Sequence, residues 1–178
     1  MRHIGDQSYP PVEQWEPDFC GAIDIRIDRE GRWYYQGSPI GRERLVKLFA
    51  SVLRRDRADG PYFLVTPVEK LEIQVDVAPL LAVEMTVSGE GVDQVIAFRT
   101  NVDDYVIVDD AHPLWLEEDA ETGEPVPLLR VRGRIDALLS RPVFYQLIEL
   151  ARPRQPGGPL GVWSSGGFFE LGGGGDED

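Results

Sequence analysis

The chain has 178 residues, 42% of them hydrophobic, and a formal net charge of −13 at pH 7. A chain of this length can bury a hydrophobic core large enough to fold without disulfide bonds or a structural metal. Its single cysteine, Cys20, excludes an intramolecular disulfide and a cysteine-based zinc cluster. Fifteen acidic and two basic residues fall between positions 68 and 126, whereas the flanking segments are balanced. Because no segment is net basic, neither nucleic acid nor an anionic membrane is an expected partner.

Residues 1–18 predict an extended N-terminal arm. They contain acids and prolines but no apolar signal segment, and we expect Tyr9 and Trp15 to pack onto the body. The longest apolar run, residues 77–83, is interrupted by a proline and is too short to span a bilayer. We therefore expect a cytoplasmic protein in which Cys20 is a core side chain rather than a nucleophile.

Residues 19–67 predict an N-terminal α/β lobe. Isoleucines alternate with charged residues from Ala22 to Asp28, which indicates a half-buried strand, and Gly31 turns the chain into a returning strand. Ser38 followed by a proline predicts a helix start, with the helix extending to about Asp56. The strands of this lobe are predicted at residues 22–28, 33–35 and 62–66.

Residues 68–152 predict an antiparallel lobe that ends in a helix. A serine and a proline open that helix at Ser140, and it runs through Ala151. A strand meander followed by one helix is the order found in pleckstrin-homology-like barrels, and by this analogy the fold class is α+β. The strands are predicted at residues 71–77, 82–87, 95–100, 105–108, 113–117 and 128–135.

Residues 153–178 are rich in glycine and predict a flexible tail. The tail also carries four apolar side chains, which either form a docking motif for a protein partner or fold back onto the same chain. These side chains are Trp163, Phe168, Phe169 and Leu171.

Two segments of the chain resemble one another when the sequence is shifted by 102 positions. Both give the order strand, turn, strand, serine, helix, which favours a duplicated unit, although any capped helix would supply some of the identities. A duplication would place two related lobes face to face, and the cleft between them is then the expected ligand site. The shift aligns Gly31 and Arg32 with Gly133 and Arg134, Ser38 with Ser140, and Leu45, Val46 and Leu48 with Leu147, Ile148 and Leu150.

The sequence offers little material for catalysis. Two histidines, His3 and His112, are too few for a histidine metal site, and no phosphate-loop or dinucleotide-binding glycine motif occurs. We therefore expect a binding protein without a metal or cofactor. Nucleotide hydrolysis by an acid such as Glu69 is the enzymatic alternative.

Three places have the residue types that recognise a small anion. At Arg42 a helix start and a guanidinium come together, which would suit a phosphate. The alternative is that this segment only caps the helix and that the arginine is solvated. Thr66 and Glu69 end a strand and would present a hydroxyl and a carboxylate to a ribose or base. Arg99 with Thr100 and Asn101 forms a group of donors, and the alternative there is a structural ion pair between Arg99 and an acid.

Several short motifs follow one another along the chain between about residues 10 and 152. They are Trp15-Glu16-Pro17, Phe19-Cys20-Gly21, Gly31-Arg32-Trp33-Tyr34-Tyr35, Gly37-Ser38-Pro39-Ile40-Gly41-Arg42, Leu48-Phe49, Leu64-Val65-Thr66-Pro67-Val68-Glu69-Lys70 and Phe98-Arg99-Thr100-Asn101. Their order resembles domain of unknown function family 1285 (DUF1285), a family of bacterial proteins.

The resemblance implies two lobes with repeated strand-strand-helix motifs, a second lobe that is superficially pleckstrin-homology-like, and a ligand site at their interface. It also implies a nucleotide-based ligand and a role in signal transduction, with oxidative stress as the suggested setting. We expect Arg42, Arg99 and Thr66 to hold the anion, and a base to stack near Trp33 or Tyr35. The alternative is a protein-interaction adaptor that docks a partner through the acidic meander face or the aromatic tail.

Overall fold

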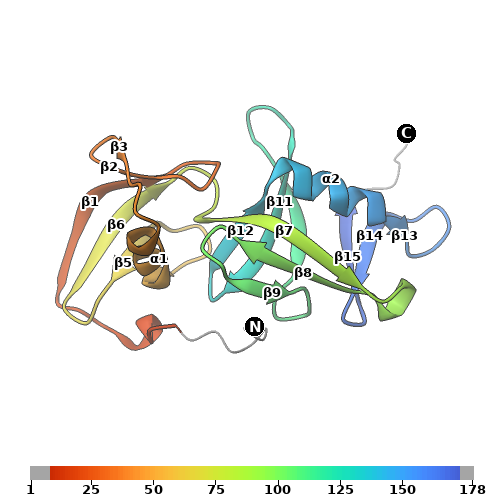
Figure 1. Ribbon diagram of the computed structural model, residues 1–178, viewed down its shortest axis with the longest axis horizontal. Coiled ribbons are helices and arrows are strands. Elements are labelled where there is room, and N and C mark those ends of the chain that lie inside the picture. Colours follow the sequence, from red (N-terminus) through yellow and green to blue (C-terminus); the bar gives the residue numbers. More distant parts are fainter. Residues whose placement is uncertain (1–8, 173–178) are drawn as a thin grey trace.

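The computed structural model describes residues 9–172 and arranges them as two sheet-rich lobes with one helix on each (Figure 1). The outer ends of the predicted arm and tail, residues 1–8 and 173–178, lie outside the described residues. The lobes lie side by side along the long axis of the molecule, α1 against the first and α2 against the second. The two-lobed α+β architecture is thus confirmed.

The first lobe is a mixed six-stranded sheet in the order β3-β2-β1-β6-β5-β4. β1 and β2 form the predicted hairpin, whereas β1 and β6 are parallel, which requires the crossover that α1, β4 and β5 provide. The elements are η1 (Val12–Gln14), β1 (Phe19–Ile27), β2 (Trp33–Tyr35), β3 (Ser38–Pro39), α1 (Glu43–Ser51), β4 (Leu53–Arg55), β5 (Tyr62–Val65) and β6 (Glu69–Val75).

The second lobe has a six-stranded sheet in the order β10-β11-β12-β7-β8-β9 and a smaller sheet in the order β13-β14-β15. Most neighbours are antiparallel as expected, but β12 and β7 are parallel. The elements are β7 (Leu80–Ser88), η2 (Gly91–Asp93), β8 (Val95–Thr100), β9 (Tyr105–Ile107), β10 (Leu114–Glu118), β11 (Pro125–Arg132), β12 (Ile135–Leu139), α2 (Arg141–Leu150), β13 (Arg152–Pro153), β14 (Leu160–Ser164) and β15 (Gly167–Gly172).

A hairpin, a helix and three strands occur in the same order in each lobe, as β1 to β6 and as β11 to β15, with the short β3 added before the helix in the first lobe. The shift of 102 positions places α1 over the later part of α2 and the turn before β2 over the turn before β12. The two units therefore share an order of elements. Their origin by duplication stays a prediction, as does the likeness to pleckstrin-homology domains.

The first helix is shorter than predicted at both ends. Ser38 does not cap it, because Ser38 and Pro39 pair with β2 as a short edge strand, and α1 begins at Glu43. The helix ends at Ser51, because the next residues pair with β5 and place Leu53, 1% exposed, in the core. The β-sheet pairing of these apolar residues overrides their helical spacing.

The boundaries predicted for the second lobe also differ from the structure. β6 belongs to the first sheet, so the first lobe ends near Val75 rather than at residue 67. The single strand predicted at residues 128–135 is a hairpin, because Gly133 adopts a positive φ of 50° and turns the chain between β11 and β12.

The predicted flexible tail contains an ordered hairpin, formed by β14 and β15. Val162 and Leu171 are 1% and 5% exposed and pack in the core, which corresponds to the alternative in which the tail folds back. Gly161 permits this packing, since a Cβ there would lie 2.4 Å from the carbonyl oxygen of Phe169.

Cys20 was expected in the core but is not a core residue, because it lies exposed near the start of β1.

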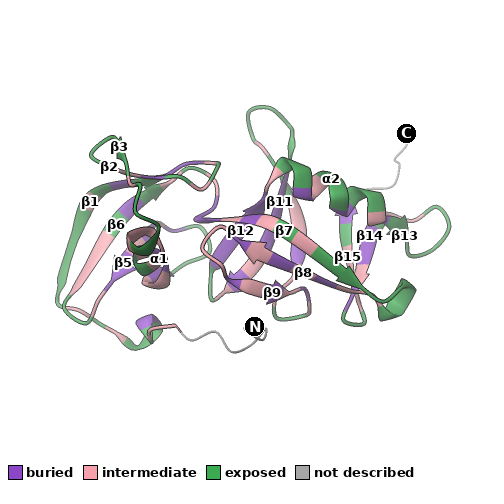
Figure 2. Ribbon diagram, in the orientation of Figure 1, coloured by how far each residue is buried: buried purple, intermediate pink, exposed green. Residues whose placement is uncertain are grey.

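The lobes share one hydrophobic core. Buried side chains of the first sheet, such as Ile25 and Leu53, belong to the same contact cluster as Leu80, Phe98 and Ile135 of the second lobe. Buried positions accordingly occur in the strands of both lobes in Figure 2. Since burying apolar surface is the main stabilising contribution to folding, we expect the two lobes to unfold together.

Arg132 of the second lobe contacts both the first lobe and the N-terminal arm. Its Nη2 donates to the Ala50 carbonyl oxygen at 2.6 Å, its guanidinium lies 4.2 Å from the centre of the Tyr9 ring, and its Nη1 is 3.5 Å from Asp104 Oδ2. The Tyr9 hydroxyl donates to Asp104 at 2.7 Å. Burial, followed by this contact with Asp104, raises the pKa of Tyr9, so the phenol remains a donor.

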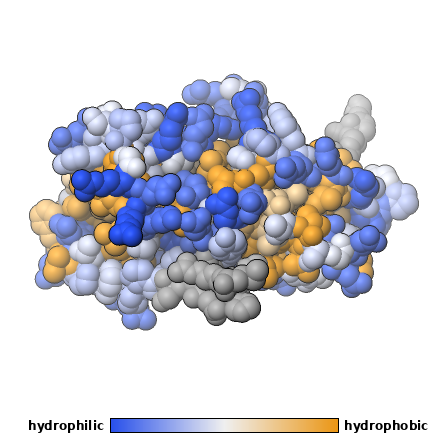
Figure 3. All heavy atoms as spheres, viewed as in Figure 1, coloured by the Kyte–Doolittle hydropathy of each residue, from blue (hydrophilic) through white to orange (hydrophobic). Residues whose placement is uncertain are grey.

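No helix among residues 9–172 is long and apolar enough to cross a membrane. On the face shown in Figure 3, hydrophilic residues cover much of the middle of the molecule, and apolar side chains are visible over both lobes.

We predict that Arg132→Met destabilises the protein by about 2–3 kcal/mol, because it leaves Asp104 buried without its cation and removes the bond to Ala50. Arg134→Met is the matched control, since Arg134 also donates to a first-lobe carbonyl, that of Asp56 at 2.8 Å, but from an exposed position. The free energy of unfolding of this control should fall by less than about 0.5 kcal/mol. Chemical denaturation measures both values, and equal losses would contradict the role given to Arg132.

Candidate functional site

The turn that joins β1 to β2 stands at the boundary between the lobes and is held by one carboxylate. Asp28 is 8% exposed, and its Oδ1 accepts hydrogen bonds from the backbone amides of Glu30 and Arg32, both at 2.9 Å. Its Oδ2 accepts from Arg32 Nε at 2.8 Å and from the Tyr34 hydroxyl at 3.1 Å. Asp28 therefore fixes the conformation of the turn.

Gly31 brings this turn against the second lobe. The Asn101 side chain donates to the Gly31 carbonyl oxygen at 3.2 Å, and its Oδ1 accepts from the Leu81 amide at 3.1 Å. Gly31 has a φ of 78°, and a Cβ on it would lie 2.7 Å from Asn101 Nδ2. Only glycine combines this backbone conformation with this close approach.

A pocket of about 340 Å³ lies beside the turn, between α1 and the loop after β8. We call it the helix-start pocket, because residues at the beginning of α1 form one wall. Both lobes contribute to it, as expected for the cleft between them. It is lined by Gly31, Arg32, Trp33, Pro39, Ile40, Gly41, Glu43, Val46, Lys47, Asn101 and Val102.

The helix-start pocket brings together groups that donate hydrogen bonds. Arg42 precedes α1 in an extended conformation and, within residues 9–172, makes no side-chain cap for it, so the helix start beside the pocket lacks a capping side chain. Trp33 is 2% exposed, and its Nε1 has no hydrogen-bond partner among the described residues. A buried N–H without an acceptor is costly, which is a reason to expect an acceptor when a ligand is bound.

The charges around this pocket are partly compensated. Lys47 Nζ lies 2.6 Å from Asp103, and Asp103 is also 3.2 Å from Arg99 Nη1. The contact with Lys47, which outweighs the effect of burial, lowers the pKa of Asp103. Arg32 pairs with Asp28 and Glu30.

Three residues predicted from the sequence lie at this pocket. Trp33 and Asn101 line it, and Arg42 is exposed next to Gly41 and Glu43, which also line it. One face of the Trp33 indole is already stacked on Phe49, with ring centres 6.1 Å apart.

Arg99 and Thr100 take part in internal contacts. The Arg99 guanidinium lies between Glu84, at 3.4 Å, and Asp103, which corresponds to the structural ion pair named as its alternative. Thr100 is fully buried, and its hydroxyl accepts from the amides of Val102 and Asp104 in the turn after β8. Neither residue lines the helix-start pocket.

Thr66, Glu69 and Tyr35 are not brought into this pocket. The Thr66 hydroxyl accepts from the Glu69 amide at 3.1 Å and so shapes the turn before β6. Glu69 pairs with Phe19 at the start of β1, at the opposite end of the strands from Gly31, which is about 20 Å away along the sheet. Tyr35 is 45% exposed on β2. A ligand role for these three residues stays a prediction.

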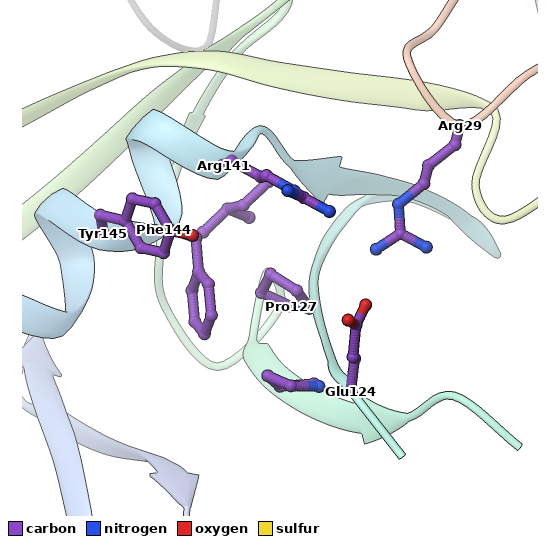
Figure 4. A pocket seen from close by; sticks show the side chains of 8 residues that line it. Arg29, Glu124, Pro127, Arg141, Phe144 and Tyr145 are labelled. Carbon is purple, nitrogen blue, oxygen red and sulfur yellow. The ribbon is translucent and has the colours of Figure 1, made fainter. Parts of the chain in front are cut away.

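A second pocket, of about 250 Å³, lies at the start of α2 (Figure 4). We call it the arginine pocket, because Arg29 and Arg141 point toward its opening. Sequence reasoning missed it, since Arg29 comes from the turn of the first lobe and Arg141 from the second lobe, with no local motif that connects them. Its lining residues are Arg29, Glu124, Pro125, Pro127, Leu139, Arg141, Phe144 and Tyr145.

Among the described residues, no group of three or more histidine, cysteine, aspartate or glutamate side chains is placed to hold a metal ion. His112 instead contacts Asp109, with 2.9 Å between Nδ1 and Oδ1.

Comparison with known proteins identifies relatives over almost the whole chain. A family model described as "Domain of unknown function (DUF1285), N-terminal domain" matches residues 10–78, and one described as "Protein of unknown function (DUF1285), C-terminal domain" matches residues 79–171. The division between the two models coincides with the end of the first sheet. No curated protein matches the chain.

Two solved structures are similar to this chain. A DUF1285 family protein from Silicibacter pomeroyi DSS-3 is 44% identical with a TM-score of 0.88, and the match covers 96% of this chain and 91% of that chain. A DUF1285 family protein from Shewanella baltica OS155 is 25% identical with a TM-score of 0.53, and the match covers 70% of this chain and 90% of that chain.

We predict that Asp28→Asn destabilises the protein by about 1–3 kcal/mol at neutral pH, because the turn loses the charged acceptor of its hydrogen bonds. Burial raises the pKa of Asp28, but hydrogen bonds from Arg32, Tyr34 and Glu30 outweigh burial and lower it. A lowered pKa in the folded state means that Asp28 stabilises the fold above its unfolded-state pKa, and that this contribution is lost as the pH falls through the folded-state pKa.

The difference in stability between native protein and Asp28→Asn should therefore shrink on acidification from about pH 5 to pH 2. Asp24→Asn is the control, since Asp24 is exposed on the same strand. Denaturation curves across this pH range measure the effect, and a difference that does not depend on pH would disprove it.

Proposed function

The chain belongs to the DUF1285 family, and from that premise we propose that it is a non-catalytic binding protein that holds a nucleotide-like anionic small molecule between its two lobes. The observation that carries the proposal is the helix-start pocket, where an uncapped helix start and a buried N–H without a partner meet at the lobe boundary. Helix starts favour anions, because their amides point outward and the helix dipole is positive there.

The composition of the pocket supports a ligand with one anionic and one apolar part. The anionic part would lie at Gly41 and the first amides of α1, within reach of Arg42 and Lys47. The apolar part would pack on Ile40 and Val46, because the Trp33 face is already covered by Phe49. At about 340 Å³ the pocket is at the small end of ligand sites, which run from about 300 to 1,000 Å³, so one nucleotide fits better than a dinucleotide.

If a protein binds such a molecule without transforming it, the fraction of protein in the bound state depends on the concentration of the molecule. We therefore place the proposed function in bacterial signal transduction, where ligand binding would change how the lobe boundary is presented to another component.

We predict that Gly41→Trp abolishes binding. A Cβ at position 41 would meet no atom within 4 Å, and Gly41 lines the pocket, so we expect the indole to fill the pocket entrance without disturbing the fold. Titration calorimetry with adenosine, guanosine and uridine monophosphates measures the affinity, with inorganic phosphate as the probe for the anion alone. Arg42→Ala should weaken binding by about three- to tenfold, since it removes one charge-assisted hydrogen bond.

Ser38→Trp is the matched control, because Ser38 is exposed on the neighbouring strand and does not line the pocket. The affinity of Ser38→Trp for the nucleoside monophosphates should equal that of the native protein. Folded native protein that binds none of the nucleotides, or Gly41→Trp protein that binds them as well as the native protein, would refute the proposed function.

A further inference from the structure

We propose that the arginine pocket is a separate binding site for a small aromatic anion, an aryl carboxylate or aryl phosphate. In this site Arg29 and Arg141 hold the anionic group, and the ring packs against Phe144 and Pro127. This site goes beyond the proposed function, because it lies on another part of the lobe boundary and shares no lining residue with the helix-start pocket.

The first argument is charge. Arg29 and Arg141 point toward the same space in Figure 4, and across residues 9–172 neither guanidinium makes a hydrogen bond or an ion pair. Many other arginines of this chain are neutralised, for example by Asp76 for Arg26 and by Asp136 for Arg130. The charge of Arg29 does act on Asp119, since backbone hydrogen bonds from Thr122 and Glu121 lower the pKa of that carboxyl and Arg29 adds to their effect. Two cations from different lobes that converge without a carboxylate of the described residues in direct contact are nevertheless suited to an external anion.

The start of α2 adds to the positive electrostatic field of the two arginines. Arg141 is the first residue of α2, a helix of ten residues, and the preceding Ser140 makes no side-chain cap hydrogen bond within the described part of the chain. The positive end of the helix dipole and the two guanidinium groups therefore act on one region. Lysine in either position would retain the charge but lose the fork that binds two oxygen atoms at once.

The second argument is shape. Pro127 and Leu139 are buried and Phe144 is half-buried, and together they give the pocket an apolar wall. In Figure 4 the Phe144 ring lies beside Pro127, below Arg141, and Arg29 stands across the opening from them. A volume of about 250 Å³ matches one ring with its acidic group and is small for a nucleotide or a peptide. The ring gains stability by packing on Phe144, and its face also attracts a guanidinium.

Glu124 is the one acidic side chain in the lining, and it faces Arg29 from the opposite wall. Its carboxylate would repel a bound anion, and it competes with that anion for Arg29. Removing its charge should therefore strengthen binding. This opposite effect distinguishes a site for anions from a site for uncharged aromatic molecules.

The test is a titration of the full chain with phenyl phosphate and benzoate, followed by amide chemical shifts in nuclear magnetic resonance spectra. Benzyl alcohol is the probe for the ring without the charge, and inorganic phosphate is the probe for the charge without the ring. We expect saturable shifts at Leu139, Phe144 and Tyr145 with both aryl anions, and an affinity for phenyl phosphate at least about tenfold above that for either partial probe.

Arg29→Ala and Arg141→Ala should each weaken phenyl phosphate binding by about tenfold, and Glu124→Gln should strengthen it by about two- to fivefold. Arg57→Ala is the matched control and should bind as the native protein does, because Arg57 is exposed and lines neither pocket. The arginine variants should keep the native melting temperature, since within residues 9–172 neither side chain makes a hydrogen bond or an ion pair, and the longer-range attraction of Arg29 to Asp119 is screened at the surface.

Unchanged affinity in both arginine variants would overturn the proposal, and so would phenyl phosphate that binds no better than inorganic phosphate. A weaker affinity in Glu124→Gln would do the same. The result is independent of the helix-start pocket, because Gly41→Trp should leave phenyl phosphate binding unchanged. Failure of one site is thereby distinguishable from failure of the other.

Discussion

The contact of Arg132 with the Ala50 carbonyl oxygen joins the two lobes, whose buried side chains form one core. Around it, Asp104 supplies the counter-charge and the Tyr9 ring covers the guanidinium, so the N-terminal arm is held against the second lobe. A largely buried cation stabilises the fold only while all of its partners are present, because the burial of each polar group costs the free energy of its lost hydration. The relative position of the lobes thus depends on a small, mostly buried polar cluster within an apolar interface.

Two acids of the acidic middle segment take part in this arrangement, and the turn between β1 and β2 positions residues of both pockets. Acids of the middle segment, Asp103 and Asp104, provide partners for Lys47 of the first lobe and for Arg132 at the boundary. The turn between β1 and β2 is held rigid by Asp28 and carries a lining residue of each pocket, Arg29 on one side and Gly31 on the other. Rigid placement of binding groups lowers the cost of binding, since less freedom is lost when a ligand arrives.

Local patterns predicted many of the strands and the position of the second helix, because alternation and helical spacing act within a few residues. The serine cap expected for that helix does not form, since Ser140 makes no side-chain cap hydrogen bond within residues 9–172. Local patterns failed where pairing with distant strands decides the outcome: Leu53 joins β4 instead of extending α1, and β6 crosses over to pair with β1. The same limit applies to the site. Trp33 and Asn101 were found because motifs surround them, whereas Arg29 and Arg141 carry no local signal and meet only through the packing of the two lobes. Thr66 and Glu69 have suitable chemistry, but the sheet places them far from the boundary.

Native-state hydrogen exchange tests most directly whether the lobes form one unit with a preformed boundary. The informative amides belong to core residues of each lobe, Ile25 and Ile73 in the first and Phe98 and Ala137 in the second. If the shared core joins the lobes, these amides exchange with the same free energy of opening, and that value falls equally with denaturant. Exchange of one lobe through a separate opening of lower free energy, while the other lobe stays protected, would contradict the account.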